Sequence, residues 1–125
     1  MCYRRWWYMN CGISCVRRYL EITHGDMGII SRLQERVSEK GLSLADVAEV
    51  MEANGYGISA YKGRVQGVLP LILLDDVRGH YYLLEKRKGI WLFLYDPNRG
   101  TIRIPFFLLG LCGYNYFVTV ERLMV

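Results

Sequence analysis

The hydrophobic pattern of this 125-residue chain changes its period near Gly57, and this change is what most constrains the fold. Before Gly57, apolar residues recur every three or four positions, which is typical of amphipathic helices. After it they form short continuous or alternating runs, which are typical of β-strands. Helices that precede an antiparallel sheet predict an α+β fold in which the N-terminal helices pack on the sheet. We expect residues 1–125 to form a single domain, because this is the length of one hydrophobic core.

Three helices are expected in the first half, and each is bounded by residues that favour helix ends. They cover residues 10–23, 28–40 and 43–54. Gly25 and Gly41 follow the first two and stop them, because glycine readily adopts the backbone conformation that ends a helix. Ser43 is a good N-cap for the third helix, and Asp46 three positions later strengthens the signal.

Six strands are expected in the second half. The continuous apolar run at residues 69–74 has the length of a strand and predicts a central strand with Pro70 at its start. Residues 87–89 predict a hairpin between two strands, and residues 96–100 predict a turn because they are rich in turn-forming residues. The expected strands cover residues 58–61, 69–74, 80–86, 90–95, 101–104 and 116–123, with a short helix at 105–109.

Composition and charge exclude several classes of protein. The 16 Lys and Arg residues exceed the 12 Asp and Glu residues by only four and are dispersed, so we expect no nucleic-acid partner. No window of 18 apolar residues predicts a membrane span, and the N-terminus lacks the apolar core of a secretion signal, so we expect a cytoplasmic protein. The cysteines Cys2, Cys11, Cys15 and Cys112 are expected to be free thiols without the paired spacing of a metal site. We expect neither a metal nor another cofactor.

Three residues have the chemistry of a thiol-dependent hydrolase. Cys11 is expected at the start of the first helix, where the helix dipole favours the thiolate, and Gly12 beside it would let a substrate backbone come close. His80 begins one expected strand and Asp96 ends the next. Because the start of one hairpin strand lies beside the end of the other, the carboxylate can orient the imidazole. Cys11, His80 and Asp96 are therefore candidates for nucleophile, base and orienting group.

Each of these residues also has an ordinary structural interpretation. A cysteine is more often a small core residue, a lone histidine a surface or capped imidazole, and an aspartate before proline a turn residue. Cys15, one turn after Cys11, is expected to be a packed core residue. Trp6 and Trp7 either line a substrate cleft or cover the core. The combination of all three residue types at matching strand ends is what favours the catalytic interpretation.

Three segments resemble the motifs of the bacteriocin-processing, double-glycine leader peptidases, a papain-like family often found at the N-terminus of peptide-exporting ABC transporters. Residues 11–16 (CGISCV) are similar to the family's nucleophile motif, with Asn10 and Ser14 as mild variants. Residues 79–84 (GHYYLL) resemble its histidine motif, and residues 95–100 (YDPNRG) resemble its Asp-Pro turn. The interval from His80 to Asp96 is similar to the family's usual one. Because the motifs occur in order over nearly the whole chain, the resemblance implies a papain-like cysteine peptidase fold.

The resemblance implies a cysteine endopeptidase that removes a leader from a small peptide precursor after a Gly-Gly-type pair. In the implied mechanism His80 would deprotonate Cys11, the thiolate would attack the peptide carbonyl, and water would hydrolyse the acyl-enzyme while Asp96 fixes the imidazole tautomer. The implied partner is a peptide whose amphipathic leader helix docks in an apolar groove. Candidates for the substrate cleft are Gly12, Trp6, Trp7 and Gly79. No transporter segment follows, so we expect a free-standing domain, with a separate ABC transporter as a candidate partner at the membrane.

One departure from the family's pattern leaves other functions open. The family carries a glutamine six residues before the nucleophile that helps to bind the oxyanion, whereas this chain has Arg5 there. Loss of one oxyanion donor lowers the rate by about two to three orders of magnitude, so an active enzyme would need a replacement donor. Arg5 and Asn10 are the candidates for this role. The alternative function is a weakly active or inactive peptidase-like module that binds a leader peptide or a partner protein. Acyl transfer to an amine, in place of hydrolysis, is a third function for the same thiolate.

Overall fold

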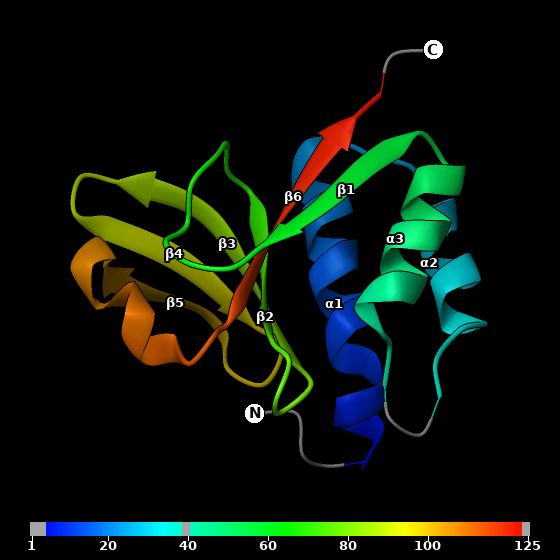
Figure 1. The fold of residues 1–125 in the computed structure, drawn as a ribbon, viewed down its shortest axis with the longest axis horizontal. Helices are drawn as coiled ribbons and strands as arrows, with labels where there is room; N and C mark the ends of the chain where they lie inside the picture. The colour runs from blue at the N-terminus through cyan, green and yellow to red at the C-terminus, as the bar shows by residue number, and fades with distance from the viewer. Residues whose placement is uncertain (1–4, 39–40, 124–125) are drawn as a thin grey trace.

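The computed structural model describes residues 5–38 and 41–123, and for residues 5–10 it describes the backbone alone. Three helices come first, namely α1 (Arg5–Thr23), α2 (Gly28–Gln34) and α3 (Leu44–Ala53). The strands are β1 (Tyr56–Tyr61), β2 (Leu71–Asp75), β3 (His80–Lys88), β4 (Trp91–Asp96), β5 (Gly100–Pro105) and β6 (Tyr116–Arg122), with the 3-10 helix η1 (Phe106–Cys112) before β6. Figure 1 shows the three helices gathered on one side of the sheet and η1 on the other. The expected α+β fold, with N-terminal helices packed on an antiparallel sheet, is confirmed.

The sheet has six strands in the order β1-β6-β2-β3-β4-β5, and each neighbouring pair is antiparallel. The strands β3 and β4 form the expected hairpin, with Leu83 opposite Tyr95 and Leu84 opposite Leu94. Its register shifts at a bulge between Leu84 and Lys86. Because β3 and β4 are antiparallel, the start of β3 and the end of β4 lie at the same end of the sheet, as the sequence predicts.

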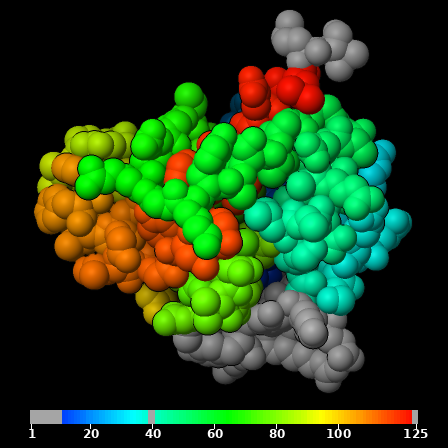
Figure 2. Space-filling view, viewed as in Figure 1, coloured from blue at the N-terminus to red at the C-terminus, as the bar shows by residue number. Residues whose placement is uncertain are grey.

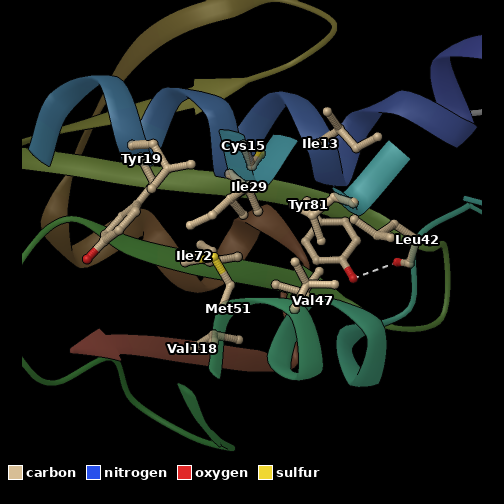
Figure 3. Packing of buried hydrophobic residues seen from close by; sticks show 14 of the residues in the cluster. Ile13, Cys15, Tyr19, Ile29, Leu42, Val47, Met51, Ile72, Tyr81 and Val118 are labelled. Carbon is tan, nitrogen blue, oxygen red and sulfur yellow. Dashed lines mark hydrogen bonds between the residues drawn. The ribbon is translucent and has the colours of Figure 1, made fainter. Parts of the chain in front are cut away.

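The two faces of the sheet carry separate hydrophobic clusters because successive side chains of a strand point to opposite faces. On the helix face, Tyr81 and Leu83 pack with side chains from all three helices. Figure 3 shows Tyr81 donating a hydrogen bond from its hydroxyl to the Leu42 carbonyl, at 2.7 Å. On the opposite face, Tyr82 and Leu84 pack beneath Leu109 of η1. The strand β3 therefore connects both halves of the core.

The expected helix ends are correct in α3 and wrong in α2. Ser43 caps α3 by accepting the Asp46 N–H at 3.1 Å, as predicted. The helix α2 ends at Gln34 instead of continuing to residue 40. Ser38 and Gly41 exchange two backbone hydrogen bonds in a tight turn, which replaces the last expected helical turns. Gly41 has a φ of +90°, so it closes that turn and not a helix.

Candidate active site

His80 and Asp96 meet at the end of the β3–β4 hairpin. Leu83 pairs with Tyr95, and extending this register by one position sets Asp96 across from Tyr82. His80, two positions before Tyr82, is then the diagonal neighbour of Asp96 on the same face of the sheet. The imidazole Nε2 lies 3.3 Å from Asp96 Oδ1. Tyr82 packs edge-on against the imidazole, with ring centroids 4.3 Å apart. The predicted contact between the two side chains is therefore present, and an aromatic ring fixes the imidazole from the side.

Cys11 reaches the same place from α1. Its thiol donates to the carbonyl of Gly79 at 3.5 Å and also forms a hydrogen bond with His80. The side chains of Cys11, His80 and Asp96 are buried, with 1%, 0% and 3% of their residues' surface exposed. The structure thus brings the three residues together in a site that excludes most water, where electrostatic interactions are stronger than at the surface.

The prediction that Cys11 lies at a helix N-terminus is wrong. The helix α1 begins at Arg5, so Cys11 lies in its second turn, beyond the reach of the first-turn dipole effect. Its backbone N–H lies inside the helix and not among the first unpaired amide groups. Stabilisation of a thiolate must then come from the imidazole of His80, as in a cysteine–histidine ion pair.

The ionisation of His80 and Asp96 follows from their contact. Burial opposes the charged imidazole, but hydrogen bonds to Asp96 and Cys11 and the negative charges of both raise the pKa of His80 above its ordinary value. Burial likewise opposes the Asp96 carboxylate, yet hydrogen bonds from His80 and from the Asn98 N–H hold the pKa of Asp96 below its ordinary value. The site therefore favours an imidazolium next to a carboxylate.

This pair predicts a window of pH in which the folded state is most stable. The raised pKa of His80 adds stability that is complete below about pH 6.5 and disappears as pH rises through the folded value. The lowered pKa of Asp96 adds stability that is complete above about pH 3.8 and disappears as pH falls through its folded value. Urea unfolding of the wild type and of Asp96→Asn should show the largest difference near pH 5. A difference independent of pH between 3 and 9 would contradict the ion pair.

The other thiols near the site differ from Cys11. Burial, followed by the negative charges of Cys11, Asp96 and Glu85, raises the pKa of Cys15 well above its ordinary value. Cys15 is completely buried, as expected for a core residue. Burial and the charge of Asp96 also raise the pKa of Cys112. Both thiols are therefore protonated at neutral pH, which makes them natural comparisons for Cys11.

The candidate cleft residues have different outcomes. Gly12 is buried, and a Cβ there would lie 3.1 Å from the Tyr81 ring, so its glycine lets α1 approach β3 closely instead of opening a path for substrate. Gly79 has a φ of +67°, which favours glycine, and its carbonyl faces the thiol. The side chains of Arg5, Trp6, Trp7 and Asn10 lie outside the described residues.

An ion pair between α1 and β3 was not anticipated from the sequence. Arg18 of α1 donates from Nε to Glu85 of β3 at 2.5 Å, and its guanidinium lies over the Tyr95 ring. Glu85 is 9% exposed and lies in the β-bulge. The only signal in the sequence was an acidic residue after four apolar or aromatic residues of a strand. The pair joins the helix that carries Cys11 to the strand that carries His80.

An apolar groove lies on the sheet face that carries His80 and Asp96. Leu84, Leu92 and Leu109 form its floor, and the Phe106–Phe107 pair lies at its rim. The segment at residues 63–67 forms the other wall, and the cavity volume is about 680 Å³. Figure 2 shows this segment (green) and η1 (orange) on the same face of the molecule. The resemblance to the leader peptidases implies a groove for a peptide but not its position.

Comparisons with known proteins identify the class to which this fold and site belong. The family model described as the peptidase C39 family matches residues 7–106, and the chain belongs to this family. None of the curated protein sequences compared matches the chain significantly.

Solved structures of peptidase domains have the same fold. The peptidase domain of Streptococcus ComA, a bifunctional ABC transporter of a quorum-sensing pathway, gives a TM-score of 0.74 at 16% identity, covering 91% of this chain and 92% of its own. A double-glycine-motif protease from an AMS/PCAT transporter, solved with its leader peptide, gives 0.71 at 18% identity, covering 90% and 84%. The peptidase C39-like domain of a Vibrio parahaemolyticus toxin-secretion protein gives 0.61 at 19% identity, covering 92% and 95%. In the described part of this chain, no helix is long and apolar enough to cross a membrane.

Proposed function

We propose that this protein is a cysteine endopeptidase that cleaves a leader from a small peptide precursor after a Gly-Gly-type pair. The observation that carries the proposal is the contact of His80 with both Cys11 and Asp96 at one end of the sheet. Membership of the peptidase C39 family supports the same reaction class. The solved relative that holds a leader peptide supports the class of substrate.

The proposed chemistry uses both ring nitrogens of His80. Because Nε2 faces Asp96, Nδ1 is the nitrogen for the Cys11 proton. The thiolate sulfur adds to the scissile carbonyl, the C–N bond breaks, and the imidazolium gives its proton to the leaving amine. Water then adds to the thioester with His80 as base, and the C–S bond breaks to release the leader's carboxylate and restore the thiol. Asp96 keeps the imidazole oriented through both steps.

The burial of Cys11 supports cleavage next to small residues. With 1% of its surface exposed, the nucleophile is accessible only to a narrow segment of peptide. A Gly-Gly pair has no side chains beyond Cα, so its carbonyl can approach where a larger residue would meet the walls. The leader helix would lie in the apolar groove, because Leu84 and Leu92 share a sheet face with His80 and Asp96. An ABC transporter remains the proposed partner for export of the product.

The test measures which thiol is nucleophilic. The rate of alkylation by a small reagent such as iodoacetamide is followed at each cysteine from pH 5 to 9, in protein carrying Cys2→Ser, with and without His80→Ala. A thiolate paired with an imidazolium has a pKa of about 3 to 4. We expect Cys11 to react fastest near pH 6, although Cys112 is more exposed. His80→Ala should restore an ordinary thiol profile at Cys11.

Cys112 and Cys15 serve as internal controls, since the pKa of each is raised. If the rates follow exposure alone, with Cys112 ahead of Cys11 at every pH, the proposed nucleophile is wrong. A slow Cys11 that still allows a leader peptide to bind would identify the protein as a leader-binding module without peptidase activity. Cleavage of a Gly-Gly peptide, with product masses that show addition of water, separates hydrolysis from acyl transfer.

A further inference from the structure

The charge of this protein is unevenly distributed along the chain. Residues 62–110 contain eight Lys and Arg and four Asp and Glu, so this segment carries the whole excess of four positive charges. Three of its four acidic residues, Asp75, Glu85 and Asp96, are buried. The helical half, residues 1–61, has seven residues of each sign. The segment that contains β2, β3, β4 and β5 is therefore positive, and the segment that contains the three helices is balanced.

All of the lining residues of the groove except Tyr114 belong to this positive segment. Among the described residues that line it are two arginines, Arg64 and Arg87, and no acidic residue. Arg87 is held at the rim, because its guanidinium lies 4.2 Å from the centre of the Phe106 ring and its Nε donates to the Gly89 carbonyl at 2.7 Å. Arg64 lies on the opposite wall, in the exposed segment that follows β1. An apolar floor thus lies between two cationic edges.

The groove is suited to a peptide helix more than to a small molecule. Beyond its floor, Phe107 is 65% and Leu111 82% exposed, so the apolar surface continues outside the cavity. Leu84 lies four positions after His80 on β3, which corresponds to about 13 Å along the strand. A helix whose apolar side covers Leu84 could therefore end in a few extended residues at Cys11. The polar flanks of such a helix would then face Arg64 and Arg87.

We infer that this groove selects an amphipathic peptide helix with acidic residues on both flanks of its apolar side. The inference rests on the proposed function and adds the charge of the substrate to it. Arg64 and Arg87 pair with Glu or Asp on the two flanks, while Leu84, Leu92 and Leu109 take the apolar anchors. Basic flanks would place like charges opposite each arginine and weaken binding. The groove thus distinguishes leaders of equal hydrophobicity by their charge.

The test compares two synthetic leaders of equal length that end in Gly-Gly and share their apolar positions. One carries Glu and the other Lys at the flanking positions, and each has a fluorescent label. Binding to Cys11→Ser protein is measured by anisotropy, so no turnover is needed. Because the Glu leader gains two exposed ion pairs, we expect its Kd to be about tenfold lower than that of the Lys leader. At 1 M salt the difference should nearly disappear, because the Debye length falls to about 3 Å.

Variants of the groove make the test specific. Arg64→Glu together with Arg87→Glu should reverse the preference, so that the Lys leader binds more tightly. Arg17→Glu, the same substitution at one exposed position of α1, should leave the preference intact. Equal binding of both leaders, or no binding of either, overturns the inference. If instead vesicles of phosphatidylglycerol bind the protein through Arg87 and the Glu leader does not compete, the surface faces lipid and the inference is wrong.

The failure of this inference is distinguishable from the failure of the proposed function. If wild-type protein cleaves both leaders equally well and depends on Cys11, the peptidase proposal stands and the charge selection does not. If the Glu leader binds selectively but neither leader is cleaved, the groove selects charge in a module without peptidase activity.

Discussion

Replacing Cys11 by serine is expected to lower kcat for cleavage of a Gly-Gly leader peptide by a factor of at least about 10⁴, as removal of one member of a catalytic triad does. The buried serine hydroxyl would remain protonated beside an imidazole adapted to a thiol, so the nucleophile would be lost while the fold is kept. His80→Ala should have an effect of the same order. Asp96→Asn should lower kcat by about 10⁴-fold, because the amide can still hold the imidazole but lets it adopt the wrong tautomer. Cleavage is followed by mass spectrometry of both fragments.

Cys15→Ala is the matched control for this prediction. Cys15 lies one helical turn after Cys11 and is equally buried, but it packs in the core and its thiol is protonated. We expect its removal to change kcat by less than about fivefold, provided that unfolding curves show a folded protein. If Cys11→Ser cleaves normally while Cys15→Ala does not, the nucleophile has been assigned to the wrong cysteine.

The contact between His80 and Asp96 could be predicted because it depends on local rules. The alternating pattern on either side of residues 87–89 defines a hairpin, and a hairpin places the start of one strand beside the end of the next. The turn after Asp96 is equally local, since Asp96 accepts the Asn98 N–H two residues later. No information about the distant α1 was needed for either feature.

The features that the sequence did not reveal depend on tertiary packing. Residues 5–10 (RWWYMN) have no clear helical period, so the start of α1 was placed five residues too late. Gly12 was assigned to a cleft because its contact with Tyr81 exists only once α1 packs on β3. The burial of Glu85 was not predicted, because it depends on the β-bulge and on the ion pair with Arg18 of the distant helix α1.

Removing Arg18 is expected to destabilise the fold more than any other exposed charge change in α1. Arg18→Ala leaves the Glu85 carboxylate, whose side chain is 7% exposed, without its guanidinium. Breaking a fully buried ion pair costs about 3–5 kcal/mol. Because the Arg18 side chain is 42% exposed, water can partly replace it, and we expect a loss of about 2 kcal/mol in the free energy of unfolding at pH 7. Urea denaturation monitored by circular dichroism measures this loss.

Two further variants separate the buried charge from the lost packing. Arg17→Ala changes the same residue type at the neighbouring exposed position, and we expect a loss below about 0.5 kcal/mol. Arg18→Ala combined with Glu85→Gln should recover part of the loss, since the remaining amide carries no charge. Equal losses for Arg17→Ala and Arg18→Ala would show that the pair is an ordinary surface contact.

The same variant tests whether the ion pair supports the site as well as the fold. Arg18 lies two helical turns after Cys11, and Glu85 lies on the strand that His80 begins, so the pair fixes how α1 and β3 lie against each other. A shift of α1 would lengthen the hydrogen bond between Cys11 and His80 and weaken the thiolate. In Arg18→Ala that remains folded, the pH profile of Cys11 alkylation should therefore move toward that of an ordinary thiol, whereas in Arg17→Ala it should not. An unchanged profile in Arg18→Ala would confine the role of the pair to stability.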